Sequence, residues 1–189
     1  MTKKDIYKSL KKELDAKRYE HTLGVAHTAA CLAMKWNEDM DKAFLAGLLH
    51  DCAKGMSDKE RLDYCKKQKI AVTEIEKANP SLLHAKAGAD MAKKIYGIED
   101  ESILDAIKWH TTGHPDMSLL EEIVFIADYI EPNRAHDPEL ITIRQEAFSD
   151  LHRATLHVYK NTLEYLSNST KQLDPTTKES YMYYKNLEE

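Results

Sequence analysis

Apolar residues recur along most of this chain at the three- and four-residue spacing of amphipathic helices. Ile6, Leu10 and Leu14 form the first such pattern, which predicts a charged helix over about residues 2–18. No stretch alternates apolar and polar residues in the way that predicts a strand. We therefore expect an all-α fold, a helical bundle in which the helices pack ridges into grooves.

Polar residues and prolines mark the ends of the predicted helices. Three S/T-x-x-E sequences begin at Ser57, Thr73 and Ser118, and each is a capping box that starts a helix. Pro132 ends the helix that follows Ser118, and Asp137-Pro138 supplies the N-cap and first residue of the next. The other predicted helices cover about residues 19–36, 43–49, 81–95, 100–110 and 150–166, with a last short helix from 174.

Composition narrows the classes of protein to consider. The 189 residues carry a net charge of -5, so the chain lacks the basic surface expected of a protein that binds duplex nucleic acid. No apolar run approaches the ~18 residues of a membrane span. The three cysteines are scattered and form no C-x-x-C pair, which predicts a reducing compartment, the cytoplasm. The sequence leaves the oligomeric state open, and a homodimer is compatible with it.

An apolar run from Ala43 to Leu49 ends in the adjacent pair His50-Asp51. Burial of a carboxylate beside an imidazole is costly unless both have partners. Adjacent helical residues also point about 100° apart, so the pair cannot share one surface. A metal ion would satisfy both side chains. The alternative is a capping aspartate next to a half-buried histidine.

Four further polar positions favour the metal. Four histidines lie at the ends of predicted helices, namely His21, His50, His84 and His110, and Asp128 shares a core-facing stripe with Leu120 and Val124. Imidazoles with carboxylates suit iron, manganese, cobalt or zinc rather than magnesium or calcium. Six ligands exceed the needs of one tetrahedral ion. Two divalent transition-metal ions, bridged by Asp51, are therefore the more natural expectation.

The order and context of these residues resemble the HD-domain metal-dependent phosphohydrolases, and in particular their bacterial YqeK-like branch. The resemblance rests on the stretches RYEHTLGVAHTA, AFLAGLLHDCAK, HAKAGA, WHTTG and ADYIEPNR, which lie between residues 18 and 134. It implies a single HD-type helical domain over residues 1–189, with a metal-site core at about 18–134 and C-terminal helices at about 138–189. Members of this branch are described as symmetrical diadenosine tetraphosphate hydrolases with a di-iron site, so iron is the favoured metal.

The resemblance also implies roles for individual residues. One ion would lie between His21, His50, Asp51 and Asp128, and the second would be held by Asp51, His84 and His110. Asp51 and Lys54 would be catalytic, and Lys54 would also contact phosphate as a point charge. The other expected substrate contacts are Thr111, Thr112, Gly113 and Arg134. Simpler explanations stay open: a solvated lysine for Lys54, a surface ion pair for Arg134, and loop capping for the rest.

The remaining polar residues near these motifs have less specific expectations. Arg18 is expected to brace the helix of His21 through a carboxylate. His114 lies close enough to His110 in the sequence for an indirect role in the site. The other histidines of the C-terminal half are expected to be exposed: His136, His152 and His157.

The leading hypothesis is a di-metal nucleotide phosphohydrolase that cleaves diadenosine tetraphosphate symmetrically into two ADP. One alternative is another HD-type nucleotide phosphatase, a 5'-nucleotidase or a deoxynucleotide triphosphohydrolase. A second alternative is a non-catalytic, nucleotide-sensing module whose metals only hold the fold. The sequence contains no Walker-type glycine loop, so a P-loop mechanism has no support. In every case the expected partner is a small nucleotide.

Overall fold

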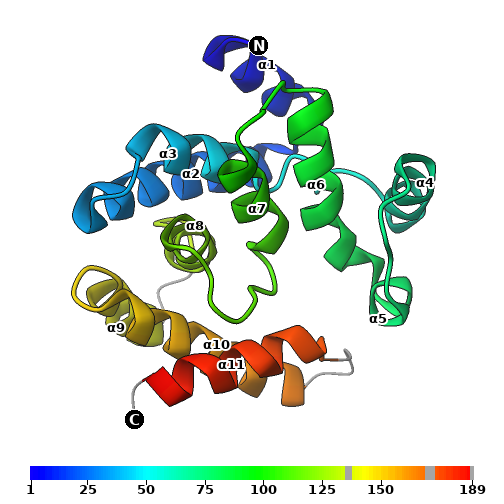
Figure 1. Cartoon of the computed structure of the whole chain (residues 1–189). Helices are drawn as coiled ribbons and strands as arrows, with labels where there is room; N and C mark the ends of the chain where they lie inside the picture. The colour runs from blue at the N-terminus through cyan, green and yellow to red at the C-terminus, as the bar shows by residue number, and fades with distance from the viewer. Residues whose placement is uncertain (135–137, 169–172, 188–189) are drawn as a thin grey trace.

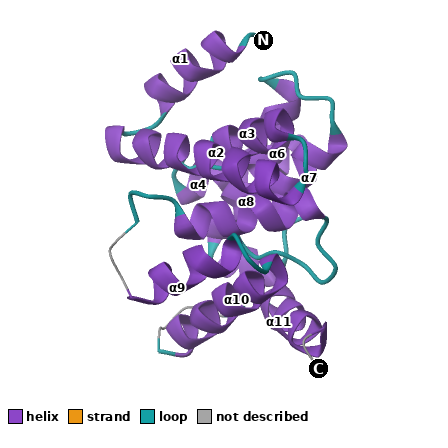
Figure 2. Ribbon diagram, turned by 90° about the vertical axis from the view of Figure 1, so that its left-hand side faces the viewer, coloured by secondary structure: helices purple, strands orange, loops and turns teal. Residues whose placement is uncertain are grey.

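The structure is a computed structural model that describes residues 1–134, 138–168 and 173–187. Helices make up most of these residues. None of these residues forms a strand, and the all-α prediction is confirmed (Figure 2). The helices are α1 Lys3–Glu13, α2 Ala16–Trp36, α3 Met40–Leu49, α4 Asp58–Gln68, α5 Glu74–Ala78, the 3₁₀ helix η1 Pro80–Leu82, α6 Leu83–Lys94, α7 Glu101–Trp109, α8 Leu119–Ile130, α9 Pro138–Ala147, α10 Leu151–Ser167 and α11 Pro175–Leu187.

Short polar side chains start most of these helices, as the sequence predicts. The capping boxes at Ser57, Thr73 and Ser118 all form, because each side chain accepts from the backbone three residues later and a glutamate returns the bond. The predicted N-cap Asp137 lies outside the described residues. The first predicted helix, 2–18, is wrong at its end: α1 stops at Glu13, and Asp15 caps α2 by accepting from the Arg18 amide.

Helix α8 forms the centre of the bundle. It packs against α2, α3 and α7 on one side and against α9 and α10 on the other, as Figure 1 shows. Its apolar residues are buried, and so are Glu121 and Glu122. The two halves of the chain therefore share one core, while the proposed boundary between residues 134 and 138 stays a prediction. No helix among the described residues combines the length and apolar character needed to cross a membrane.

Candidate metal centre

The six predicted metal ligands come together where five helices meet. His21 lies in the second turn of α2, and His50 and His110 directly follow α3 and α7. His84 lies in the first turn of α6, and Asp128 in the last turn of α8. The histidines and Asp51 are buried, whereas the Asp128 side chain is 23% exposed. Residues as distant in the sequence as His21 and Asp128 thus converge.

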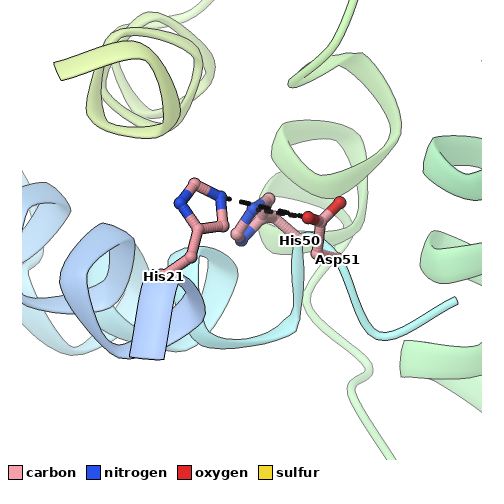
Figure 3. A group of neighbouring side chains, drawn as sticks. All are labelled: His21, His50 and Asp51. Atoms are coloured by element: carbon pink, nitrogen blue, oxygen red, sulfur yellow. Dashed lines mark ion pairs between the residues drawn. The ribbon is translucent and has the colours of Figure 1, made fainter. Parts of the chain in front are cut away.

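The two oxygens of Asp51 face two different groups of ligands. The first ligand group consists of His21, His50 and Asp128, and the second consists of His84 and His110. Oδ2 of Asp51 lies 3.5 Å from Nε2 of His50 and 4.0 Å from Nε2 of His21, and Figure 3 shows these three side chains. Its Oδ1 lies 3.3 Å from Nε2 of His84 and 3.7 Å from Nε2 of His110. On the first side, Asp128 Oδ1 adds a further oxygen, 3.0 Å from His21 Nε2. A carboxylate placed in this way has the geometry of a bridge.

Each of the four imidazoles uses its Nδ1 outside the cluster: three contact a backbone carbonyl three residues earlier, and one contacts a carboxylate. Nδ1 of His50 donates to the Gly47 carbonyl at 2.7 Å, and Nδ1 of His110 donates to the Ile107 carbonyl at 2.6 Å. His84 donates to the Ser81 carbonyl, also three residues earlier. His21 instead faces the carboxylate of Glu131, 3.1 Å away. These bonds leave every Nε2 as an acceptor directed at the cluster, which is the usual arrangement of metal-binding histidines.

Polar atoms without partners support the same conclusion. Within the described part of the chain, His21 Nε2, His50 Nε2 and Asp51 Oδ1 are buried and make no hydrogen bond of good geometry. Nε2 of His84 and Nε2 of His110 face each other at 3.1 Å. Buried polar atoms are seldom left without a partner in a folded protein. A divalent cation would satisfy them, so the cluster fits divalent metal binding.

Burial and mutual contact shift the pKa values of these groups. Burial lowers the pKa of His84 to about 4, which keeps its ring neutral and able to coordinate. Burial alone would raise the pKa of Asp51, but His50, His110 and His84 hold it well below its usual value. Burial likewise opposes ionisation of Asp128, yet His21, His50 and Arg134 lower its pKa. Burial alone would lower the pKa of His50 too, but Asp51 and Asp128 raise it above its usual value. The neutral ring of His84 and the ionised carboxylates are the protonation states that a metal requires.

Lys54 and Thr111 lie beside the second ligand group. Lys54 Nζ is 3.1 Å from Nε2 of His84 and 3.8 Å from Oδ1 of Asp51. Burial lowers the pKa of the Lys54 ammonium, while Asp51 opposes the change. Oγ1 of Thr111 lies 3.1 Å from Nε2 of His84 and 3.0 Å from Nε2 of His110. Both side chains could therefore contact a phosphate held at this group.

Arg18 and Arg134 lie beside the first ligand group. Arg18 Nη1 donates to Asp51 Oδ2 at 2.8 Å, so the carboxylate expected for Arg18 is the central one. Arg134 Nη2 donates to Asp128 Oδ1 at 2.7 Å, and its Nε donates to the Asp128 carbonyl at 3.0 Å. Both guanidinium groups compensate carboxylate charge. The exposed Arg134 is also placed to reach an incoming anion.

Thr112 and Gly113 make local contacts in the loop after α7. The Thr112 hydroxyl donates to the Gly113 carbonyl at 3.1 Å, and the Gly113 amide donates to the Trp109 carbonyl at 2.8 Å. Gly113 has a φ of +59°, and a Cβ there would collide with the Tyr159 hydroxyl. The glycine is thus required by the backbone and by Tyr159. Its amide is not free to bind phosphate, and a substrate role for either residue stays a prediction.

Glu131 is a residue that the sequence analysis did not assign to the site. It is 1% exposed, and its second oxygen accepts from the Asn133 amide at 2.8 Å. A Cβ at Gly24 would collide with the same carboxylate, so the glycine makes room for it. The carboxylate follows Asp128 by three residues, a spacing that places both on one side of the end of α8. That spacing is the signal in the sequence for a role of Glu131 in the site, whereas Pro132 indicates only the end of the helix.

The other histidines lie away from the cluster. His114 Nε2 lies 2.9 Å from Oε1 of Glu121, and the contacts of this ring include no predicted ligand. His152 is exposed as expected. The expectation for His157 is wrong: its ring is half-buried because Glu146 and Glu139 lie 2.8 Å from its two nitrogens. His136 lies outside the described residues.

A helical bundle that buries four imidazoles around a shared aspartate defines a class of metal-binding helical proteins. Residues 18–133 match the HD domain family, and the chain belongs to that family. Two relatives, each called symmetrical bis(5'-nucleosyl)-tetraphosphatase, confirm the resemblance to the YqeK-like branch. The protein from Bacillus subtilis (strain 168) is 38% identical over 94% of both chains. The protein from Halalkalibacterium halodurans is 41% identical over 91% of both.

A solved structure agrees with the fold. It is a protein from Clostridium acetobutylicum that is described as a predicted HD superfamily hydrolase involved in NAD metabolism. It is 40% identical to this chain, covers 99% of this chain and 98% of its own, and superimposes with a TM-score of 0.95. Agreement over nearly the whole length means that the arrangement of the described helices, including the C-terminal ones, recurs in that protein.

Proposed function

We propose that this protein hydrolyses diadenosine tetraphosphate symmetrically to two ADP, with two divalent transition-metal ions bridged by Asp51. The observation that carries the proposal is the division of the two Asp51 oxygens between two groups of imidazoles. The names of the relatives support the substrate. Iron is the favoured metal because of the YqeK-like resemblance, and manganese, cobalt and zinc are the alternatives for this ligand set.

The proposed ligand sets follow the two sides of Asp51. One ion would be held by Oδ2 of Asp51 with His21, His50 and Asp128. The other would be held by Oδ1 of Asp51 with His84 and His110, which leaves room for water and a phosphate oxygen. Every proposed ligand belongs to the same chain, so the proposal holds equally for a monomer and a homodimer. The free cysteines Cys31, Cys52 and Cys65 support a cytoplasmic location.

When bound, such a pair of cations supplies an activated water and neutralises phosphate charge. The protein's own residues do the positioning. Lys54 places an ammonium beside the second ligand group, where it compensates charge on the phosphate under attack. Thr111 offers a hydroxyl to the same phosphate. Arg134 leaves Asp128 to bind a neighbouring phosphate, for which its planar guanidinium is suited.

The fold also explains why water must be delivered at a defined place. His50, Asp51, His84 and His110 are each no more than 2% exposed, so bulk solvent has little access to the second ligand group.

Attack at either central phosphorus of the symmetrical chain expels an ADP. A diphosphate leaving group needs little protonation. The protein therefore needs no general acid of high pKa at that position.

The test is hydrolysis in oxygen-18 water by protein loaded separately with iron, manganese, cobalt and zinc. Metal content is measured first by elemental analysis. Two equivalents of ADP per substrate, with one label between them on a terminal phosphate, are expected. ATP with AMP as products would refute symmetrical cleavage. An absence of turnover with every metal would instead indicate a nucleotide-sensing module, and preference for mononucleotides in a substrate panel would indicate another HD-type phosphatase.

A further inference from the structure

A cavity of about 290 Å³ lies between α5, α6, α7 and the start of α11. In Figure 1, α11 runs below the end of α7. Apolar side chains contribute much of the wall, including Ile75, Leu82, Trp109 and Pro175. Among the described residues of the wall, two lysines are offset by three carboxylates, and Lys86 is already paired with Glu76 at 2.7 Å. This cavity therefore has the lining of a site for a neutral, partly apolar group.

The cavity is connected to the candidate metal centre through one side chain. Thr111 lines the cavity, and its hydroxyl is also within 3.1 Å of the Nε2 atoms of His84 and His110. Trp109 lies two residues earlier, at the end of α7. A molecule whose phosphate is bound at the second ligand group would thus extend past Thr111 toward the indole.

A second cavity, of about 330 Å³, lies beside the first ligand group and has the opposite character. His21 lines it together with three cations, Lys17, Arg18 and Arg134, and with the carboxylates Asp15 and Glu131. The described wall therefore carries one more positive than negative charge, whereas the cavity near Trp109 carries one more negative charge. A chain of phosphates is attracted to the basic cavity and disfavoured in the cavity near Trp109.

We propose that the cavity at Trp109 holds one nucleoside of the substrate, while the remaining phosphates run across the metal centre toward the basic cavity. This inference rests on the proposed function and makes it more specific. Only one of the two nucleosides is recognised, because the two cavities differ in charge and lining. The substrate class is then nucleoside 5'-tetraphosphates with either one or two nucleosides.

Adenosine 5'-tetraphosphate is the diagnostic substrate. Water would add to its β-phosphorus, the bond from that phosphorus to the oxygen shared with the γ-phosphorus would break, and the products would be ADP and pyrophosphate. We expect its KM to lie within about tenfold of that of diadenosine tetraphosphate. A KM more than a hundredfold higher would mean that both nucleosides are required, and would overturn the inference.

Trp109→Ala and Trp109→Phe test the cavity itself. Loss of an aromatic contact with a base raises KM by about five- to a hundred-fold, so the alanine variant should show that rise for both nucleotides. The phenylalanine variant should stay near wild type. Inhibition by inorganic tripolyphosphate, which has no nucleoside, should be unchanged in both variants, as should metal content. An unchanged KM in Trp109→Ala would overturn the proposal.

Fluorescence gives a readout that does not depend on turnover. The chain has two tryptophans, Trp36 and Trp109, and the Trp36 indole donates to the Ala147 carbonyl away from this cavity. In Trp36→Phe the emission comes from Trp109, and ADP should quench it with saturation. In Trp109→Phe the emission comes from Trp36, and ADP should leave it unchanged. No quenching in Trp36→Phe would overturn the proposal.

The two proposals fail in different ways. If wild-type protein cleaves diadenosine tetraphosphate to two ADP and Trp109→Ala behaves like wild type, only the nucleoside cavity is wrong. If wild-type protein cleaves neither tetraphosphate, the proposed function is wrong. Quenching of Trp109 by ADP would then still establish the cavity as a nucleotide site.

Discussion

Nδ1 of His21 lies 3.1 Å from Oε1 of Glu131, and the two side chains are 110 residues apart in the sequence. Both are buried, at 7% and 1% exposure. Of the four histidines in the cluster, only His21 has its Nδ1 beside a carboxylate; Nδ1 of each of the other three contacts a backbone carbonyl. A carboxylate in this position fixes the tautomer and orientation of the ring and makes Nε2 a better ligand.

Replacement of Glu131 by Gln should therefore weaken metal retention on the His21 side. Loss of such an outer contact costs about 10- to 100-fold in metal affinity or activity. Elemental analysis after dialysis against a graded chelator series measures the effect. The matched control is Glu122→Gln on α8, the helix that ends directly before Glu131. Glu122 is equally buried but bonds to His152 and Thr155. The control should lose stability and keep its metal; equal metal retention in both variants would contradict the prediction.

Asp51→Ala should remove most of the bound metal and reduce turnover to background. Both predicted ions depend on this carboxylate, since each of its oxygens faces one ligand group. His84→Ala should affect mainly the second ion and leave the first partly occupied. His27→Ala is the control, because that ring packs against Phe44 outside the cluster. Full metal content and turnover in Asp51→Ala would show that the ligand assignment is wrong.

Lys54→Ala and Arg134→Ala should fold and retain metal but lose catalytic efficiency. A hydrogen bond between charged groups contributes about 1.5–3 kcal/mol, which corresponds to roughly ten- to a hundred-fold in kcat/KM. Arg153→Ala removes the same charge from an exposed ion pair with Glu146 and should leave kcat/KM unchanged. Steady-state kinetics measure kcat/KM for the three variants and for wild type. If Lys54→Ala and Arg134→Ala match Arg153→Ala, neither cation contacts substrate.

His157 should make the stability of the C-terminal helices depend on pH. Burial lowers the pKa of His157, but Glu146 and Glu139 outweigh burial and raise it above 6.5. A raised pKa in the folded state means that the contribution is fully present below pH 6.5 and is lost as the pH rises through the higher folded value. The thermal midpoint of wild type should exceed that of His157→Gln by more at pH 6 than at pH 9. An equal difference at both pH values would contradict this mechanism.

The helices follow from local patterns, and so do most of the ligands. Ser57, Thr73 and Ser118 are capping residues whose partners lie three positions away, so the sequence alone is sufficient to place them. The break between α1 and α2 was missed because helix-forming residues continue through Asp15, which caps α2. Leu14 ends α1 and Asp15 starts α2, with no glycine or proline between the two helices.

Contacts between distant segments could not be derived in the same way. Periodicity places Asp128 on an inward stripe, but it does not show which oxygen of Asp51 faces which histidine. It also gives no partner for Arg18, which reaches Asp51 across 33 residues, or for His157, which depends on Glu139 in another helix. These relationships depend on the angles and positions at which the helices pack against each other. The apolar periodicity of one sequence does not show them.

The contrast between the local and the distant bonds of the imidazoles has a consequence for the order of assembly during synthesis. His50, His84 and His110 are each oriented by a carbonyl three residues earlier, so a nascent chain can align them as soon as each turn forms. His21 is made first, yet the chain must be extended to Glu131 before that ring is fixed. Because a ribosome delivers residues in sequence, His84 and His110 would be oriented before His21 completes the other ligand group. Metal capture at one position could then precede completion of the fold at the other.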